Sequence, residues 1–254
     1  MDVIKKQLVL LLCSTALLIA SPFADYRILA LIGVVFSALM YFVGNIRYFA
    51  IGTAVLSLLY GLGIIPASAF FGPLVMVLFG ELLKTLLVKT GHSLAVFGAG
   101  SAAALIFAML YTNEFEPLVG SLAILVLLML RSILGEREDG SMLSLIGVSM
   151  TIVLFEDLEF LVDLRTLAFA ILLCAAFGYF AYRANTIDLT GVFSAVLFGV
   201  ILISFTDTVA WFLIILVFFI LGSAFTKFKY SEKEFLGVAQ GKGGKRGYKN
   251  AFAN

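Results

Sequence analysis

The sequence predicts an all-α fold, namely a polytopic integral membrane protein of about ten transmembrane helices with both termini in the cytoplasm. Three observations lead to this prediction: the composition, the lengths of the apolar runs and the positions of the basic residues. Of the 254 residues, 62% are hydrophobic and 13% are charged, whereas soluble domains are about half apolar and about 25% charged. A water-soluble fold of this length cannot bury so much apolar surface, so a bilayer must surround most of the chain.

The apolar runs have the length that a membrane requires. A helix needs about 20 apolar residues, with a range of about 17 to 25, to cross the hydrocarbon core. Charged and turn residues divide the chain into runs at 7–21, 28–43, 48–65, 68–88, 93–111, 118–134, 142–155, 166–182, 189–205 and 209–226. The run 142–155 is the weakest and also fits a half-helix or re-entrant segment. Lys5 and Lys6 before the first run also fit a signal peptide, but a retained helix is favoured.

The basic residues set the orientation. With the N-terminus inside, fifteen of the 17 Lys and Arg residues fall on the cytoplasmic side, and only Arg27 and Arg165 fall outside. This asymmetry follows the positive-inside rule, and it predicts an even number of spans. The expected location is a prokaryotic plasma membrane. The net charge of +1 provides no basic field for nucleic acid, so no nucleic-acid partner is expected.

A glycine- and lysine-rich segment near the end of the chain is the first candidate for chemistry. Residues 237–250 contain five glycines, four of them between residues 241 and 247, and the basic side chains of Lys242, Lys245, Arg246 and Lys249. Glycines allow positive φ, and successive backbone N–H groups in such turns bind anions. The spacing is not that of a phosphate-binding Walker loop. Two interpretations stay open: a nucleotide-phosphate loop, or a flexible basic tail that touches anionic lipids.

Two further features carry ionisable side chains at span ends. Asp188 precedes the ninth run, where it fits a magnesium ligand or base, or simply a helix N-cap. Glu81 and Lys84 lie three residues apart on one helical face, as a functional intramembrane pair or as a structural ion pair. The cysteines, Cys13 and Cys174, and the single histidine, His92, lack metal-ligand spacing.

The C-terminal part of the chain resembles a known family. The matching blocks are Asn185-Thr-Ile-Asp-Leu-Thr-Gly191, Gly222-Ser-Ala-Phe-Thr-Lys227, Leu236-Gly-Val-Ala-Gln-Gly-Lys-Gly-Gly-Lys-Arg-Gly-Tyr-Lys-Asn250 and Ala253-Asn254. In this order they resemble the phytyl-phosphate kinase family of integral membrane proteins, which belongs to the vitamin E pathway and includes uncharacterised archaeal and bacterial members. The resemblance implies transfer of a phosphoryl group to an isoprenyl phosphate from a nucleoside triphosphate, CTP in related polyprenol kinases, with Mg²⁺.

The resemblance also assigns site residues by position. Asn185 and Asp188 become candidate catalytic residues, and Asp188 is also the candidate metal ligand. The candidate nucleotide-binding residues are Lys227, Lys242, Gly243, Gly244, Lys245, Arg246 and Asn250. The resemblance covers residues 183–254 and stops within the family's domain, so part of the active site is expected downstream. Residues 1–180 then form an N-terminal helical region of unknown role, and residues 181–254 the first part of the kinase-like domain.

The expected function is therefore a membrane-embedded isoprenyl-phosphate kinase that acts at the cytoplasmic surface of the bilayer. The alternative from another class is a transporter or lipid-moving protein without catalysis, which ten spans and an intramembrane ion pair also suit. A non-catalytic scaffold is a third possibility. The sequence leaves the lipid substrate, the nucleotide and the oligomeric state open.

Overall fold

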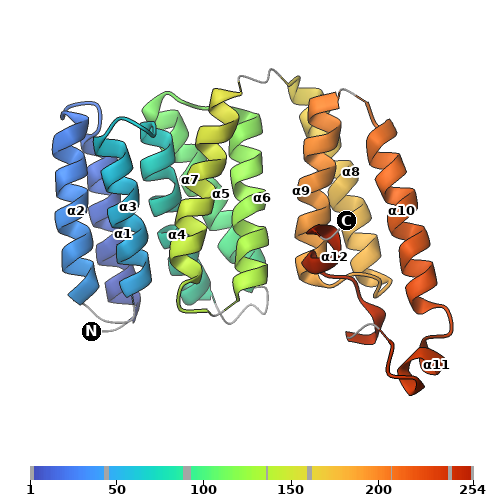
Figure 1. The fold of residues 1–254 in the computed structure, drawn as a ribbon. Helices are drawn as coiled ribbons and strands as arrows, with labels where there is room; N and C mark the ends of the chain where they lie inside the picture. Colours follow the sequence, from blue (N-terminus) through green and yellow to red (C-terminus); the bar gives the residue numbers. More distant parts are fainter. Residues whose placement is uncertain are drawn as a thin grey trace. The chain divides into compact units, whose positions relative to one another are not determined.

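The protein is an all-helical membrane protein, as predicted (Figure 1). The computed structural model describes residues 3–42, 46–87, 93–135, 137–158, 162–206, 208–239 and 242–252. His92, Gly241 and residues 253–254 lie outside this part, and only the backbone of Lys242 is described. Within the described ranges, ten long helices correspond to the ten predicted runs, and eight of them have the length and hydropathy of membrane spans. The helices α2 and α3, with 17 and 15 residues, are shorter.

The chain divides into two compact units, residues 1–159 and 160–254. The first contains α1 (Val3–Ala20), α2 (Tyr26–Phe42), α3 (Arg47–Gly61), α4 (Ala67–Leu87), α5 (Ser93–Thr112), α6 (Pro117–Leu134) and α7 (Gly140–Asp157). The second contains α8 (Leu164–Arg183), α9 (Leu189–Thr206), α10 (Ala210–Lys227), α11 (Tyr230–Phe235), the 3₁₀ turn η2 (Lys242–Gly244) and α12 (Tyr248–Phe252). The division falls one helix before the predicted boundary at residue 180, because α8 packs along α9.

The helix α4 is the centre of the first unit. It packs against α1, α3, α5 and α7, and most of its side chains are buried. At one end of this core, Tyr60 stacks on Phe70 with ring centroids 4.8 Å apart. Close helix contact requires small residues at the crossing points, and a side chain at Gly80 would collide with Ser101 and Phe97. On α5, a Cβ atom at Gly100 would likewise lie 2.8 Å from Leu83 of α4, so small residues on both helices allow close packing.

The weakest predicted span is a complete helix. The helix α7 runs for 18 residues, so residues 142–155 are not a half-helix. Its polar side chains do not interrupt it, because Ser144 and Thr151 donate hydrogen bonds to the carbonyl oxygens of Gly140 and Gly147, one turn earlier. Hydroxyls bonded in this way are satisfied inside the helix and need no water.

The ion pair predicted within α4 has a third member. Lys84 Nζ lies 3.9 Å from Glu81 Oε2, as the spacing predicts, but Glu81 also pairs with Arg131 of α6. The Arg131 guanidinium in turn lies 5.4 Å from the centroid of the Phe97 ring on α5. These contacts join three helices, so the geometry favours the structural interpretation of Glu81.

The orientation of the chain in the membrane is testable by labelling. In a background with Cys13 and Cys174 replaced by alanine, we expect Val238→Cys to resist a membrane-impermeant maleimide added to intact cells. Phe115→Cys, in the turn between α5 and α6, is expected to react. Permeabilised cells serve as the control, in which both positions should react. Labelling of residue 238 from outside would refute the assignment of a cytoplasmic C-terminus.

Candidate functional site

In the second unit, the segment that follows α11 folds back onto the start of α9. The Arg246 backbone N–H donates to the Thr186 carbonyl over 2.9 Å, and the Asp188 N–H donates to the Arg246 carbonyl over 3.0 Å. These bonds form a short parallel bridge between Ile187 and Arg246. We call residues 242–252 the returning segment. Its end, α12, packs on α9, where Phe252 contacts Phe198 with ring centroids 5.2 Å apart (Figure 1).

Asp188 holds this junction together as a helix cap. Its Oδ1 accepts hydrogen bonds from the Gly191 N–H at 3.0 Å and from the Thr190 hydroxyl at 2.6 Å. Thr190 Oγ1 also accepts a bond from the Tyr248 N–H at 3.1 Å. Asp188 therefore satisfies an otherwise unbonded donor of α9 and, through Thr190, fixes the returning segment.

A glycine on α9 permits the close approach of the two segments. A Cβ atom at Gly191 would lie 2.7 Å from the Arg246 carbonyl oxygen, a distance that no side chain tolerates against backbone. Gly191 closes the first block of the resemblance, and Arg246 belongs to the third. The structure thus explains why glycine is needed at this place.

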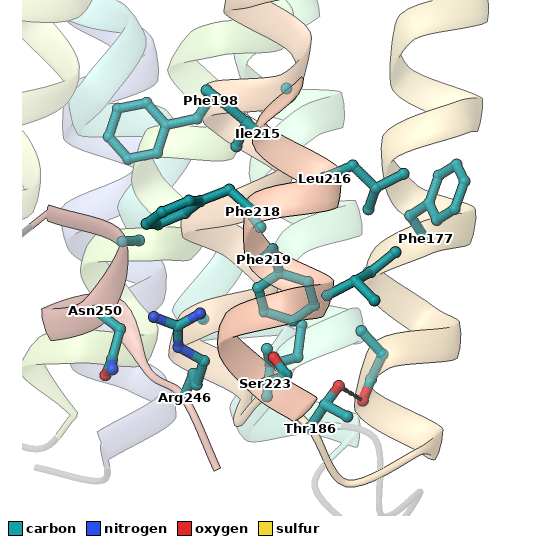
Figure 2. A pocket seen from close by; sticks show the side chains of 18 of the residues that line it. Phe177, Thr186, Phe198, Ile215, Leu216, Phe218, Phe219, Ser223, Arg246 and Asn250 are labelled. Carbon is teal, nitrogen blue, oxygen red and sulfur yellow. Dashed lines mark hydrogen bonds between the residues drawn. The ribbon is translucent and has the colours of Figure 1, made fainter. Parts of the chain in front are cut away.

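A large cavity lies between α8, α9, α10 and the returning segment, all within the second unit (Figure 2). Its volume is about 1210 Å³, beyond the range of about 300–1,000 Å³ that small-molecule pockets have. Most of the lining is apolar and comes from transmembrane helices. The aromatic members are Phe177, Phe180, Phe198, Phe212, Phe218 and Phe219. A cavity of this size and composition fits a long hydrocarbon chain.

One end of the cavity is polar, and Arg246 is one of the two cationic residues in its described lining, the other being Lys227. The guanidinium lies 5.9 Å from the centroid of the Phe219 ring, and its buried Nε has no hydrogen-bond partner among the described residues. Figure 2 shows Arg246 and Asn250 on the returning segment, opposite Phe219 and Ser223 of α10. The other polar lining residues are Thr186, Ser223, Lys227 and Asn250.

The Arg246 guanidinium is placed inside the span of α10. A side chain at Gly222 would collide with Nη1 of Arg246, so the guanidinium lies directly against this glycine. Gly222 precedes the last residue of α10 by five positions, which is about 7 Å along the axis. A cation beside an apolar helix is a candidate for function, although near a helix end a long cationic side chain also reaches the headgroup region.

The structure brings together only some of the predicted site residues. Lys227, Arg246 and Asn250 line the cavity, and Lys227 Nζ donates to the Ala184 carbonyl at 3.1 Å. Asp188 supports the junction and does not line the cavity. Asn185 is exposed in the turn between α8 and α9, with a left-handed φ of 54°.

The predicted phosphate loop forms the turn η2 outside the cavity. Gly243 and Gly244 adopt φ values of 65° and 75°, so the expected positive φ is confirmed there. Gly244 packs against Tyr230 of α11, and Gly243 is exposed. Lys245 is partly exposed and directly precedes Arg246. The loop is therefore next to the cavity, because the residue that follows it in the chain lines the cavity.

Sequence reasoning missed the cavity itself and Ser223. A signal was available, because Phe212, Leu216, Phe219, Ser223 and Lys227 recur at intervals of three or four residues along α10. This spacing places them on one helical face, and all five line the cavity. Along this face the side chains change from apolar to hydroxyl-bearing to cationic. A binding site for an amphiphilic ligand has the same order.

The described residues do not form a complete magnesium site by themselves. Among them, no group of three or more His, Cys, Asp or Glu side chains is placed to hold a metal ion. Asp188, the predicted ligand, uses its Oδ1 for the two hydrogen bonds of the cap. Magnesium sites in kinases draw on one or two carboxylates together with substrate phosphates, so the metal role of Asp188 stays a prediction.

Comparison with known proteins places this region in context. The model of an integral membrane protein family, DUF92, matches residues 172–254. The match contains the cavity's polar end, Asp188 and the returning segment, and it agrees with a multi-pass membrane protein. No curated protein and no solved structure matches the chain.

The cap geometry gives a stability prediction. We expect Asp188→Ala to destabilise the protein by about 1 kcal/mol, the usual effect of removing a helix N-cap, with a lower melting temperature in detergent. Asp188→Asn retains an oxygen that accepts from the Gly191 N–H, so it should keep most of the stability. If Asp188 also acts in catalysis, the asparagine variant would fold normally and still lose at least about tenfold in rate, about 1.4 kcal/mol in barrier. Equal melting temperatures for Asp188→Ala and wild type would contradict the cap.

Proposed function

We propose that the protein is a membrane-embedded kinase that phosphorylates an isoprenyl monophosphate with a nucleoside triphosphate of the CTP type. The observation that carries the proposal is the cavity of the second unit, an apolar, half-open space between transmembrane helices with the Arg246 guanidinium at one end. The resemblance of residues 183–254 to phytyl-phosphate kinases supports the same conclusion independently.

The acceptor lipid would occupy the cavity. Its isoprenoid chain would lie along the phenylalanines of α8, α9 and α10, where burial of each CH₂ group contributes about 0.8 kcal/mol. Its phosphate would reach Arg246, whose planar guanidinium can form two parallel hydrogen bonds to a phosphate. This assigns Arg246 to the acceptor, whereas the resemblance alone grouped it with the nucleotide-binding residues.

The nucleotide would bind at η2. Lys242, Gly243, Gly244 and Lys245 directly precede Arg246, and side chains of successive residues in extended backbone point to opposite sides. Arg246 faces the cavity, so Lys245 belongs to the other side of the segment. One short stretch of chain would then hold two phosphate groups close together, as phosphoryl transfer requires.

The reaction itself demands little acid–base chemistry. An anionic oxygen of the lipid phosphate attacks the γ-phosphorus of the nucleotide, and the bond from that phosphorus to the β,γ-bridging oxygen breaks. The electron pair leaves with the nucleoside diphosphate, and an isoprenyl diphosphate forms without removal of a proton. The chain's contribution is positioning and charge neutralisation. Magnesium enters only as the usual companion of a nucleoside triphosphate, and no step is assigned to it.

A transfer assay tests this function. Purified full-length protein in detergent is incubated with γ-labelled CTP and either geranylgeranyl or phytyl monophosphate, and the lipids are then extracted. We expect label in the isoprenyl diphosphate. No label in any lipid with CTP, ATP, GTP or UTP, combined with protein-dependent movement of isoprenyl phosphate between liposome leaflets, would establish the alternative, a lipid-moving protein.

A further inference from the structure

Ser223 is a polar residue of the cavity that no step above uses. It lies on α10 and is only 6% exposed, and its Oγ has no hydrogen-bond partner among the described residues. Helical hydroxyls in this protein commonly bond to a carbonyl one turn earlier. Thr226, in the next turn of α10, donates to Gly222 at 2.7 Å, and Ser194 of α9 donates to Thr190 at 2.9 Å.

Three other serines in the described ranges resemble Ser223 in burial and in lacking a hydrogen-bond partner, but not in location. Within the described part of the chain, Ser14, Ser101 and Ser204 also have buried Oγ atoms without a partner. None of these three lines the cavity, whereas Ser223 does, beside Arg246 and Phe219 (Figure 2). A buried polar group left without a hydrogen bond destabilises the folded protein. A phosphate oxygen that reached the Ser223 Oγ would supply the missing bond.

We propose that Ser223 is a ligand-binding residue and that, with Arg246, it makes a two-point site for the phosphate monoester of a long-chain alcohol. The Arg246 guanidinium lies against Gly222, the residue before Ser223 on α10, and Arg246 and Ser223 both line the cavity. The hydroxyl donates to a phosphate oxygen while the guanidinium neutralises the charge. This assignment rests on the proposed function for the lipid phosphate, but it requires no nucleotide and no turnover.

The test compares two serines of the same unit. Equilibrium binding of tritiated geranylgeranyl monophosphate and of geranylgeraniol is measured with full-length protein in nanodiscs. We expect Ser223→Ala to weaken monophosphate binding about tenfold, as loss of a hydrogen bond to a charged group does, with little effect on the alcohol. Ser204→Ala, at a buried serine outside the cavity, should change neither affinity more than about twofold, and Ser223→Thr, which keeps the hydroxyl, should retain tight binding.

The outcomes separate this inference from the kinase proposal. Equal monophosphate affinities for Ser223→Ala and Ser204→Ala, with both variants folded, would overturn the role of Ser223. Equal losses for monophosphate and alcohol would also overturn it, because the effect would then be on packing. Binding that depends on Ser223 without any label transfer from nucleotide would uphold the site and refute the kinase. Transfer that proceeds with unchanged lipid affinity in Ser223→Ala would uphold the kinase and refute the site.

Discussion

Replacing Arg246 with alanine is expected to weaken binding of an isoprenyl monophosphate by about a hundredfold or more. Two charge-assisted hydrogen bonds to phosphate, at about 1.5–3 kcal/mol each, correspond to at least this factor. The variant should fold, because the bonds that dock the returning segment come from the backbone N–H and carbonyl of residue 246. Equilibrium binding in nanodiscs measures the effect, and the affinity for the free alcohol should change little.

Two companion variants sharpen this prediction. Lys249→Ala removes a charge from an exposed position of α12 that does not line the cavity, and it should leave lipid binding unchanged. Arg246→Lys retains the charge without the planar pair of donors, so its affinity should fall between those of wild type and Arg246→Ala. A loss for Lys249→Ala as large as that for Arg246→Ala would indicate general attraction of anions to a basic surface and would contradict a specific headgroup site.

The double change Lys242→Ala and Lys245→Ala is expected to weaken the binding of the nucleotide and not that of the lipid. Both residues belong to the segment assigned to the nucleotide, so CTP affinity should fall more than about a hundredfold, from the loss of charged hydrogen bonds to phosphate. The affinity for geranylgeranyl monophosphate should stay within about threefold. Titration with a fluorescent CTP analogue and the lipid-binding assay measure the two quantities on one preparation.

The charge-matched control for that variant is Lys5→Ala with Lys6→Ala, which removes two lysines from the first unit. It should not alter CTP affinity. If CTP binding survives in the Lys242 and Lys245 variant while binding to vesicles containing anionic lipid weakens, these lysines contact lipid headgroups, and the basic-tail interpretation is correct.

The helices could be predicted from the sequence because their signals are local. Charged and turn residues interrupt the apolar runs, and each run became a helix, including 142–155, where Ser144 and Thr151 bond within the helix. Partners across helices were harder to predict. The spacing of Glu81 and Lys84 indicated one ion pair, but the contact with Arg131, fifty residues later, depends on how α4 packs near α6.

The sequence predicted which residues belong to the candidate site, but not how they are arranged in space. Residues 185–191, 222–227 and 236–250 were singled out as blocks, and in the structure they meet. What joins them is the bridge between Ile187 and Arg246 and the room left by Gly191 and Gly222, which no local pattern reveals. The resemblance assigned Asp188 to catalysis and Arg246 to the nucleotide, and these roles stay predictions. The structure shows Asp188 in the helix cap that the sequence also allowed, and Arg246 in the lining of the lipid-sized cavity.

The central claim is that the cavity of the second unit holds an isoprenyl phosphate with its phosphate at Arg246, and photocrosslinking tests it most directly. A geranylgeranyl monophosphate analogue with a diazirine near the end of its chain is bound to the protein in nanodiscs and irradiated, and the labelled peptides are sequenced by mass spectrometry. The account predicts labelling of the apolar lining on α8, α9 and α10, competed by unmodified monophosphate and abolished at the same concentration by Arg246→Ala. Labelling confined to residues 1–159, or labelling of the second unit that Arg246→Ala leaves unchanged, would contradict it.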